Sequence, residues 1–429
     1  MSTPAARSDV TNAGEGPGVK ARPAPLAGIT VLDFSQFLAG PVAALRLADL
    51  GARVIKVERP PGGDIGRQLA FAGASIDGDT ISFHAMNRNK ESVAADLKDD
   101  ADLAIVRRMI SSADVMIENF RPGVMKRLGL DYESVRKLNP RIIYGSISGY
   151  GPDGPWAGKP GQDLLAQAVS GLPWANGSAG GPPVAVGLSI ADHLASCQLA
   201  LGIAALLVRR ERTGEGGIVE TSLLEGVLDF QFELLTAFFT MPGFLTRRGG
   251  AYAANAYLGA PYGVYPTSDG YLALAMGSVP KIGTLIGLEA LAGFSDPESW
   301  TVERDTIAGL LGGHLSAETT QHWLDLLEPA DIWCAPVLTL NALAESKAFA
   351  ALSVIQEVSR RPADGNGPPV IVRTVRSPLR VDGAVLAAPG GAPRVGEHSA
   401  AIRAEFSPLE PETVDTEQTV ATEQTGSLP

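Results

Sequence analysis

Short apolar runs alternate with segments of helical spacing over the first half of the chain. Residues 29–35 (ITVLDFS) and 52–58 (ARVIKVE) are short, apolar and rich in β-branched side chains, and residues 41–51 (PVAALRLADLG) between them have helical spacing. The same order recurs in three later segments, 113–120 (ADVMIENF), 132–139 (YESVRKLN) and 141–149 (RIIYGSISG). This alternation predicts an α/β fold in which helices cover a parallel sheet.

The boundaries of the first helix are marked in the sequence. Pro41 fits the first position of a helix, and Gly51 fits the position just past its end. We therefore expect the first strand, helix and second strand to follow one another with short connections.

The pattern changes in the second half of the chain. Residues 222–240 predict a long apolar helix that stops at Met241-Pro242-Gly243. Residues 260–276 (APYGVYPTSDGYLALAM) then alternate apolar and polar positions around a Ser-Asp-Gly turn, which is typical of a hairpin. We expect a large domain that begins with residues 26–220, a linker helix over 221–245 and a small α+β domain over 246–330.

The two ends of the chain have a different composition. Residues 1–25 are rich in Ala, Pro and Gly, and residues 407–429 carry five acidic and no basic side chains. Such segments bury too little apolar surface to fold. We expect a disordered arm over 1–25 and an acidic disordered tail over 407–429.

Charge and cysteine content narrow the classes of function. A net charge of −12 argues against a general nucleic-acid-binding protein, which needs a basic surface. Cys197 and Cys334 form neither a disulfide framework nor a zinc motif, which favours the reducing cytoplasm. The longest apolar run, Leu194 to Val208, is shorter than the ~18 residues of a membrane span and predicts a buried helix. The five histidines lack paired metal-ligand spacing, so we expect no metal.

The first β–α–β unit resembles a dinucleotide site but lacks its glycines. A G-x-G-x-x-G fingerprint lets backbone approach a pyrophosphate, and only Gly40 is present here. Basic residues nevertheless cluster near predicted strand ends. Because ligands of open α/β sheets bind beyond the carboxyl ends of strands, some of these residues are candidates for binding phosphate: Lys56, Arg59, Arg88, Lys90, Lys98, Arg121, Lys126 and Arg127.

Two carboxylates precede apolar helices. Asp163 comes before LLAQAVSG, and Asp192 comes before HLASCQLALGIAALLVRR. Local sequence favours helix capping for both, because an Asp oxygen accepts hydrogen bonds from the free N–H groups of the first turn. The alternative for Asp192 is a nucleophile held at the start of a helix. Local sequence leaves both readings open.

Several motifs in order along the chain resemble one family, the family III CoA-transferases, which includes formyl-CoA transferase and carnitine CoA-transferase. The resemblance covers residues 26–400 and rests on LDFSQFLAGPVAALRLADLGARVIKVERPPGGD, NRNKESVAADLK, ADVMIENFRPGVMKRLGLDYESVRKLNPRIIYGSISGYGPDGPW, GQDLLAQAVSG, GLSIADHLASCQLALGIAALLVRRERTGEGGIVETSLLEG and APYGVYPTSDGYLALAM. It implies a Rossmann-like large domain to which residues 331–406 return, and an interlocked homodimer.

The resemblance also implies the chemistry. The family's nucleophile corresponds to Asp192, which would attack an acyl-CoA to form an aspartyl anhydride and then an aspartyl-CoA thioester, so that a carboxylic acid acquires CoA without a metal. We expect the helix start to keep Asp192 charged. The implied CoA contacts are Leu38, Ala39, Arg59, Ala95, Lys98, Asn119, Phe120 and Arg127, and the implied substrate contacts are Gln162, Asp163 and Gly259.

Two departures from the family pattern bear on specificity. Leu38 stands where the formyl-CoA branch has Gln, and its glycine-rich loop is reduced here to YLGAPYG. The alternatives are an α-methylacyl-CoA racemase, whose Gly-His-Asp motif reads Gly161-Gln162-Asp163 here, and a non-catalytic CoA-binding protein. Since Gln cannot accept a proton from carbon at neutral pH, we favour the transferase, with acyl-CoA and carboxylic acids as its only partners besides the second subunit.

Overall fold

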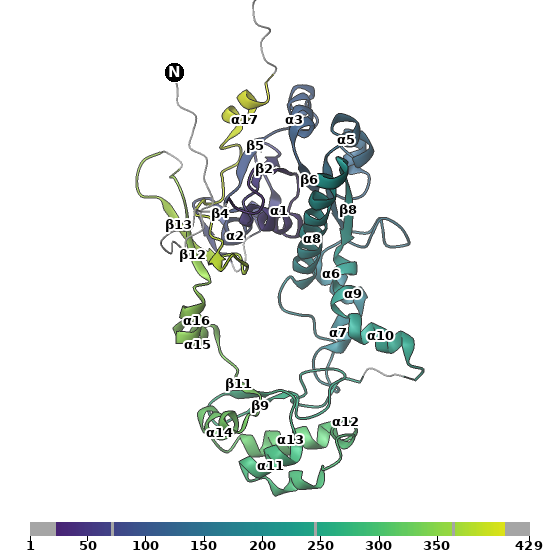
Figure 1. Ribbon diagram of the computed structural model, residues 1–429, viewed down its shortest axis with the longest axis vertical. Helices are drawn as coiled ribbons and strands as arrows, with labels where there is room; N and C mark the ends of the chain where they lie inside the picture. Colours follow the sequence, from purple (N-terminus) through teal and green to yellow (C-terminus); the bar gives the residue numbers. More distant parts are fainter. Residues whose placement is uncertain (1–22, 70–72, 244–246, 363–364, 408–429) are drawn as a thin grey trace, which may run out of the picture.

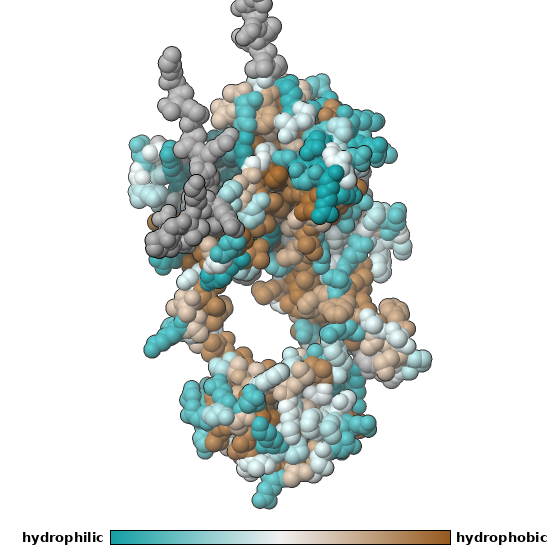
Figure 2. Space-filling model, in the orientation of Figure 1, coloured by the Kyte–Doolittle hydropathy of each residue, from teal (hydrophilic) through white to brown (hydrophobic). Residues whose placement is uncertain are grey.

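The computed structural model describes residues 23–69, 73–243, 247–362 and 365–407. Almost all of the predicted arm (1–25) and tail (407–429) lies outside these residues. The described chain forms an open ring, with a large α/β part at one end and a small part at the other (Figure 1). The hole of the ring persists when all atoms are drawn (Figure 2).

A six-stranded parallel sheet forms the centre of the large part. Its order is β5-β2-β1-β6-β7-β8, and every neighbouring pair is parallel. The order reverses direction between β1 and β6, so the loops that follow these two strands diverge and leave a crevice at their carboxyl ends. The strands are β1 (Thr30–Asp33), β2 (Arg53–Glu58), β5 (Glu91–Ala94), β6 (Val115–Glu118), β7 (Ile143–Ser148) and β8 (Gly217–Ser222).

Each face of the sheet buries its own apolar cluster. Successive residues of a strand point to opposite faces, and accordingly Val31 packs against α1 and α8 while Leu32 packs in the cluster of α3 and α5. The helices of the large part are α1 (Ala39–Asp49), α2 (Ile81–Asn87), α3 (Asp100–Ser112), α4 (Val124–Leu128), α5 (Tyr132–Leu138), α6 (Asp163–Ser170), α7 (Leu172–Ala175) and α8 (Ile190–Thr213). The predicted α/β fold with a parallel sheet is confirmed.

The first helix begins slightly earlier than expected. α1 starts at Ala39, so Pro41 is its third residue, and Gly51 follows the helix with φ of 98°, a conformation that glycine adopts without strain. α8 is long and apolar enough to cross a membrane, a test that buried helices also pass. Here one side of it packs against β7, β8, α1, α6 and α9 (Leu223–Phe230). Only 33% of its apolar window is buried within the described chain, which corrects the expectation of a buried helix.

The small part contains the predicted hairpin. β9 (Gly263–Pro266) pairs antiparallel with β10 (Tyr271–Leu274), which also pairs with β11 (Cys334–Pro336). The pairing of β11 corrects the expected boundary at residue 331, because the chain returns to the large part only after Pro336. The sheet packs on α11 (Val279–Ile286), α13 (Arg304–Leu315) and α14 (Thr320–Leu327), with the short α12 (Ser299–Val302) at the side.

Two connections join the parts and close the ring (Figure 1). The outgoing one is not the single predicted helix: it is divided into α9 and α10 (Phe232–Thr240) at Gln231, whose side-chain amide donates to the carbonyls of Ser170 and Val227. The returning one contains α15 (Leu340–Glu345) and α16 (Lys347–Leu352). It leads to the antiparallel pair β12 (Ile355–Arg360) and β13 (Val370–Val375).

The last described segment covers the free edge of β5. His398 exchanges hydrogen bonds with Ser92, the Ser399 hydroxyl accepts from the N–H of Ala94, and Arg403 donates to the carbonyl of Ala94. α17 (Ser399–Glu405) then contributes Ile402 to the cluster of α3. Residues near the end of the described chain therefore cover the edge of a sheet built from its first half.

Candidate active site

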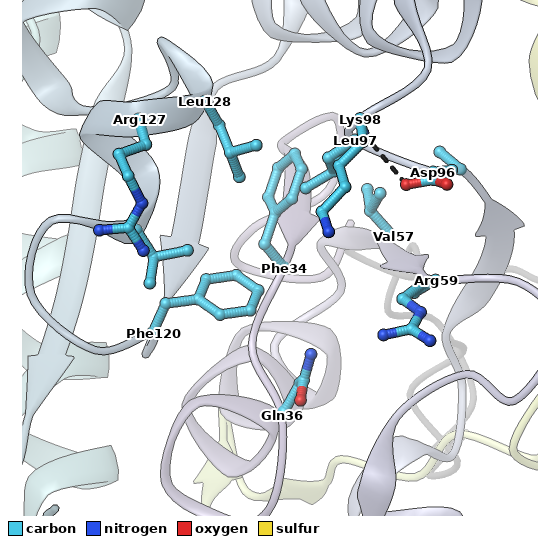
Figure 3. Close-up of a pocket in the computed structure, with 12 residues that line it drawn as sticks. Phe34, Gln36, Val57, Arg59, Asp96, Leu97, Lys98, Phe120, Arg127 and Leu128 are labelled. Carbon is cyan, nitrogen blue, oxygen red and sulfur yellow. Dashed lines mark hydrogen bonds between the residues drawn. The ribbon is translucent and has the colours of Figure 1, made fainter.

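A cavity of about 340 Å³ lies at the carboxyl edge of the sheet, where the strand order reverses. Its lining comes from the segments that follow β1, β2, β5 and β6: Phe34, Gln36, Val57, Arg59, Ala95, Asp96, Leu97, Lys98, Phe120, Val124, Arg127 and Leu128. Figure 3 shows Phe34 and Phe120 between Arg127 on one side and Lys98 and Arg59 on the other. An apolar floor with cations at its rim suits a flat group that carries phosphates.

The rim cations have no protein partner within the described residues. Arg59, Lys98 and Arg127 are exposed, and no carboxylate or carbonyl of the described chain accepts a hydrogen bond from their side chains. An unpaired guanidinium or ammonium group is available to a ligand anion. The cavity therefore presents three free positive charges in a protein of net negative charge.

The cavity brings together five of the expected CoA contacts, namely Arg59, Ala95, Lys98, Phe120 and Arg127. The other three, Leu38, Ala39 and Asn119, do not line it. Asn119 instead holds the loop after β1, because its side-chain oxygen accepts from the N–H of Gln36 at 2.8 Å and its amide donates to the carbonyl of Gln36 at 2.8 Å. Leu38 and Ala39 lie at the start of α1.

Asp192 lies in the first turn of α8, two residues after Ile190. Ser189 holds the cap position, and the carboxylate of Asp192 accepts no hydrogen bond from the described residues. The capping interpretation is therefore wrong for Asp192. Its carboxylate is half-buried and free to act on a ligand.

Asp163 supplies the missing cap from another helix. Its Oδ1 accepts from the N–H of Ala191 at 2.6 Å and from the N–H of Asp192 at 3.2 Å. Asp163 is itself the first residue of α6, and no side chain caps that helix. Asp163 is therefore a helix cap, as predicted, but it caps α8 and not α6, the helix that it precedes in sequence.

The pKa of Asp192 is raised to about 7, first by burial and then by the negative charge of Asp163. This corrects the expectation that the helix start keeps Asp192 charged. The N–H groups that would stabilise its carboxylate are bound to Asp163 instead. Near neutral pH, Asp192 is therefore divided between its two protonation states.

One side chain connects the start of α8 to the start of α1. The hydroxyl of Ser196, one turn after Asp192, lies 2.7 Å from the carbonyl oxygen of Ala39 and 2.6 Å from that of Asp192. Because Ala39 follows the loop that lines the cavity, the Asp192 turn and the cavity are parts of one packed unit.

The remaining expected contacts lie apart. Gln162 is exposed just before α6, next to Asp163. Gly259 belongs to the small part, where a Cβ would lie 2.8 Å from the carbonyl oxygen of Trp300. Close packing explains this glycine, and within one chain the small part lies across the ring from α8 (Figure 1).

Sequence reasoning missed several residues of the site. The apolar floor includes Phe34, Val57 and Leu97, and the rule that ligands bind beyond strand ends could have identified Phe34 directly after β1. Gln167 was also missed, although it follows Asp163 by four residues and so faces the same side of α6. Within the described ranges no group of three or more metal-ligating side chains is found.

The fold and cavity define an α/β protein with a cation-rimmed cavity at the switch point of a parallel sheet. Residues 26–399 match the model of CoA-transferase family III, and the chain belongs to this family. It is 35% identical over 399 residues to succinate–glutarate CoA-transferase of Agrobacterium fabrum, covering 91% of this chain and 97% of the relative. It is 34% identical over 390 residues to acetyl-CoA:oxalate CoA-transferase of Acetobacter aceti, covering 89% and 96%.

The architecture matches solved structures of the same kind. A CAIB/BAIF family protein from Brucella suis superposes with a TM-score of 0.76 at 31% identity, covering 90% of this chain and 100% of that one. The chain is therefore a transferase of the CoA-transferase class. The racemase alternative is not supported by these relatives.

Proposed function

We propose that the protein moves CoA from an acyl-CoA to a carboxylic acid through covalent intermediates on Asp192. The observation that carries this proposal is the half-buried Asp192 carboxylate, which accepts no hydrogen bond from the described residues and lies on the same packed unit as the cavity. The names of the relatives support small dicarboxylic acids as the acids exchanged.

The cavity would hold the nucleotide end of CoA. Phe34 and Phe120 would contact the adenine ring, and the free cations Arg59, Lys98 and Arg127 would bind phosphate oxygens. The pantetheine arm would then follow the loop of Leu38 and Ala39 towards the first turn of α8. Binding far from the reacting carbon would fix the thioester against Asp192.

The chemistry conserves atoms without any other reactant. A carboxylate oxygen of Asp192 attacks the thioester carbon, the C–S bond breaks, and CoA leaves as a thiolate from an aspartyl-acyl anhydride. The thiolate then attacks the aspartyl carbon, which forms an aspartyl-CoA thioester and releases the first acid. The acceptor carboxylate repeats both steps in reverse. No net proton is consumed.

The test combines a variant with a chemical trap. Asp192→Asn should fold normally and lose turnover by at least about 10³-fold, since the nucleophile is gone. Hydroxylamine added during incubation with succinyl-CoA should convert Asp192 to a hydroxamate, which peptide mass spectrometry detects. Glu211→Gln, an exposed change on the same helix, is the control. Near-normal turnover in Asp192→Asn would refute the mechanism.

The finer description of the fold is also a proposal. The large part is Rossmann-like, which is supported by its strand order, equivalent to 3-2-1-4-5-6 in chain order. We expect an interlocked homodimer in which a second chain passes through the ring. Large apolar side chains exposed on α6, α8 and α10 support this, among them Leu164, Leu201 and Phe239, and apolar surface borders the hole (Figure 2). The cytoplasm is the expected compartment, as both cysteines are unpaired.

Assembly can be tested in solution. Because the exposed apolar faces would be buried only in the dimer, unfolding should depend on protein concentration. Sedimentation at low concentration measures this directly. A stable folded monomer would contradict the interlocked dimer and leave the chemistry of Asp192 untouched.

A further inference from the structure

The cap of α8, a helix of 24 residues, is supplied by another helix of the same chain, α6. Ser189 stands at the cap position but donates and accepts no capping hydrogen bond through its side chain. The carboxylate of Asp163 accepts hydrogen bonds from the N–H of Ala191 and the N–H of Asp192. The start of α8 is therefore fixed to α6 by an ionisable side chain from 28 residues earlier in the sequence.

Gln167 holds Asp163 in place. This side chain is 1% exposed, and its amide nitrogen donates to Oδ2 of Asp163 at 2.6 Å. Its oxygen accepts from the N–H of Val186 at 2.9 Å. One turn of α6 thus fixes both the irregular segment that leads into α8 and the first turn that carries Asp192.

This geometry decides what the Asp192 carboxylate can bind. The N–H groups at a helix start normally attract a carboxylate and stabilise its charge. Here Asp163 occupies the two that lie nearest, and it adds a negative charge of its own. We propose that Asp163, oriented by Gln167, is a positioning residue that withholds the first-turn N–H groups of α8 from Asp192 and so keeps that carboxylate a reactive nucleophile.

Other charged groups around α8 are engaged elsewhere. On α1, Arg46 lies 3.6 Å from Asp49, which also pairs with Arg88. Burial, and then the charge of Arg46, lower the pKa of His193. On α9, Glu225 accepts from Ser222 and Asp229 from Gln198. The charge of Glu220 on β8 contributes to the raised pKa of Glu118 and of Tyr144, and β7 carries no charged side chain. Asp163 is the group whose charge raises the pKa of Asp192.

The experiment measures the protonation of Asp192 without turnover. A water-soluble carbodiimide with an amine modifies protonated carboxyl groups, and peptide mass spectrometry follows Asp192 across pH 4 to 9. The half-point, the pH at which labelling of Asp192 is half of its maximum, should lie near pH 7 in the parent protein. In Asp163→Asn, which keeps an oxygen acceptor but loses the charge, it should fall by about one pH unit or more. Asp163→Ser is the second neutral variant, for use if Asn disturbs folding.

The conservative variant Asp163→Glu should keep the half-point within about 0.3 units of the parent, because the charge remains. The pH profile of kcat/KM should move in the same direction as the labelling, with a plateau about tenfold lower in the neutral variants, because a less basic carboxylate is a weaker nucleophile. Identical half-points in all four proteins would overturn the inference.

This inference rests on the proposed role of Asp192, but the two fail in different ways. If Asp192 is not the nucleophile, hydroxylamine leaves it unmodified, while the carbodiimide half-points still report whether Asp163 controls its protonation. If Asp163 has only a structural role, Asp192 is still trapped, and the neutral variants lose stability with no shift of the half-point.

Discussion

Two sets of basic side chains lie on or next to the same two strands, and one set is buried while the other is exposed. Lys56 lies within β2 and is completely buried, whereas Arg59, just after the strand, is exposed at the rim of the cavity. Lys90, at the start of β5, is likewise buried, whereas Lys98 beyond its end is exposed. The contrast shows that position at a strand end does not by itself assign a cation to a ligand.

The buried cations are all paired. Lys56 donates to the carbonyl of Ser35 and contacts Asp64 at 2.9 Å. Lys90 donates to Asp33 at 2.8 Å, to the carbonyl of Pro41 at 2.8 Å and to Asn87 at 2.9 Å. These lysines hold the loop between β1 and α1, on which the cavity and the Asp192 turn both depend.

The paired lysines also control the charge of Asp33. Burial would raise the pKa of Asp33, but the charges of Lys56 and Lys90 lower it to about 2. Burial lowers the pKa of Lys90 to about 8. The rim cations, by contrast, face solvent, and their partner is to be supplied by the ligand.

The largest effect is expected from removing a buried cation. Lys90→Met leaves Asp33 buried with one fewer counter-charge, and the carbonyl of Pro41 loses its donor, so the free energy of unfolding should fall by about 3–5 kcal/mol. Urea unfolding followed by circular dichroism measures this. A loss of unfolding free energy below about 1 kcal/mol would show that the buried pair has little structural role, and the contrast between buried and rim cations would then be wrong.

The rim cations should show the opposite behaviour. Arg59→Ala, Lys98→Ala or Arg127→Ala should each raise KM for acyl-CoA by about tenfold, as expected for the loss of one charged hydrogen bond, with little change in stability. Initial rates and thermal melts together separate these effects. Lys126→Ala is the matched control, because Lys126 is exposed on α4 beside Arg127 but does not line the cavity. An equal rise in KM for the control would contradict a specific site.

A third, pH-dependent effect concerns Asp192, a half-buried charge that has no counter-ion. Because its pKa is raised from 3.8 to about 7, the folded protein retains a proton that the unfolded chain releases between about pH 4 and pH 7, so stability falls as pH rises through this window. Asp192→Asn should therefore melt a few degrees higher than the parent protein at pH 8 and no higher at pH 4. Scanning calorimetry at both pH values is the measurement. A rise in melting temperature that is the same at both pH values would show that packing, and not the charge of Asp192, causes the effect.

The sequence predicted those features that depend on neighbouring residues. The apolar runs of β1, β2, β6 and β7, the glycine after α1 and the Ser-Asp-Gly turn of the β9–β10 hairpin are all local signals, and the structure has each of them. The break between α9 and α10 was not predicted because no Pro or Gly marks it. The partner of β11 was not predicted because its pairing with β10 spans about 60 residues of sequence.

The chemistry of the site was predictable in type but not in arrangement. The motifs indicated Asp163 and Asp192 as important carboxylates, but the sequence does not show that Asp163 caps α8 and that Asp192 caps no helix. Their roles depend on the packing of α6 against α8. Likewise the sequence does not show that Lys56 faces Asp33 and Asp64 inside the protein while Arg59, three residues later, faces the cavity.

The cover over β5 has a consequence for synthesis of the protein. The outer edge of this strand receives its hydrogen bonds from Gly396, His398 and Ser399. On the ribosome, residues 91–94 emerge some 300 residues before these partners, and the small part is translated in between. The edge strand of the first half of the chain thus stays open until residues 396–399 have been synthesised, and during that time it is available to pair with the edges of other chains.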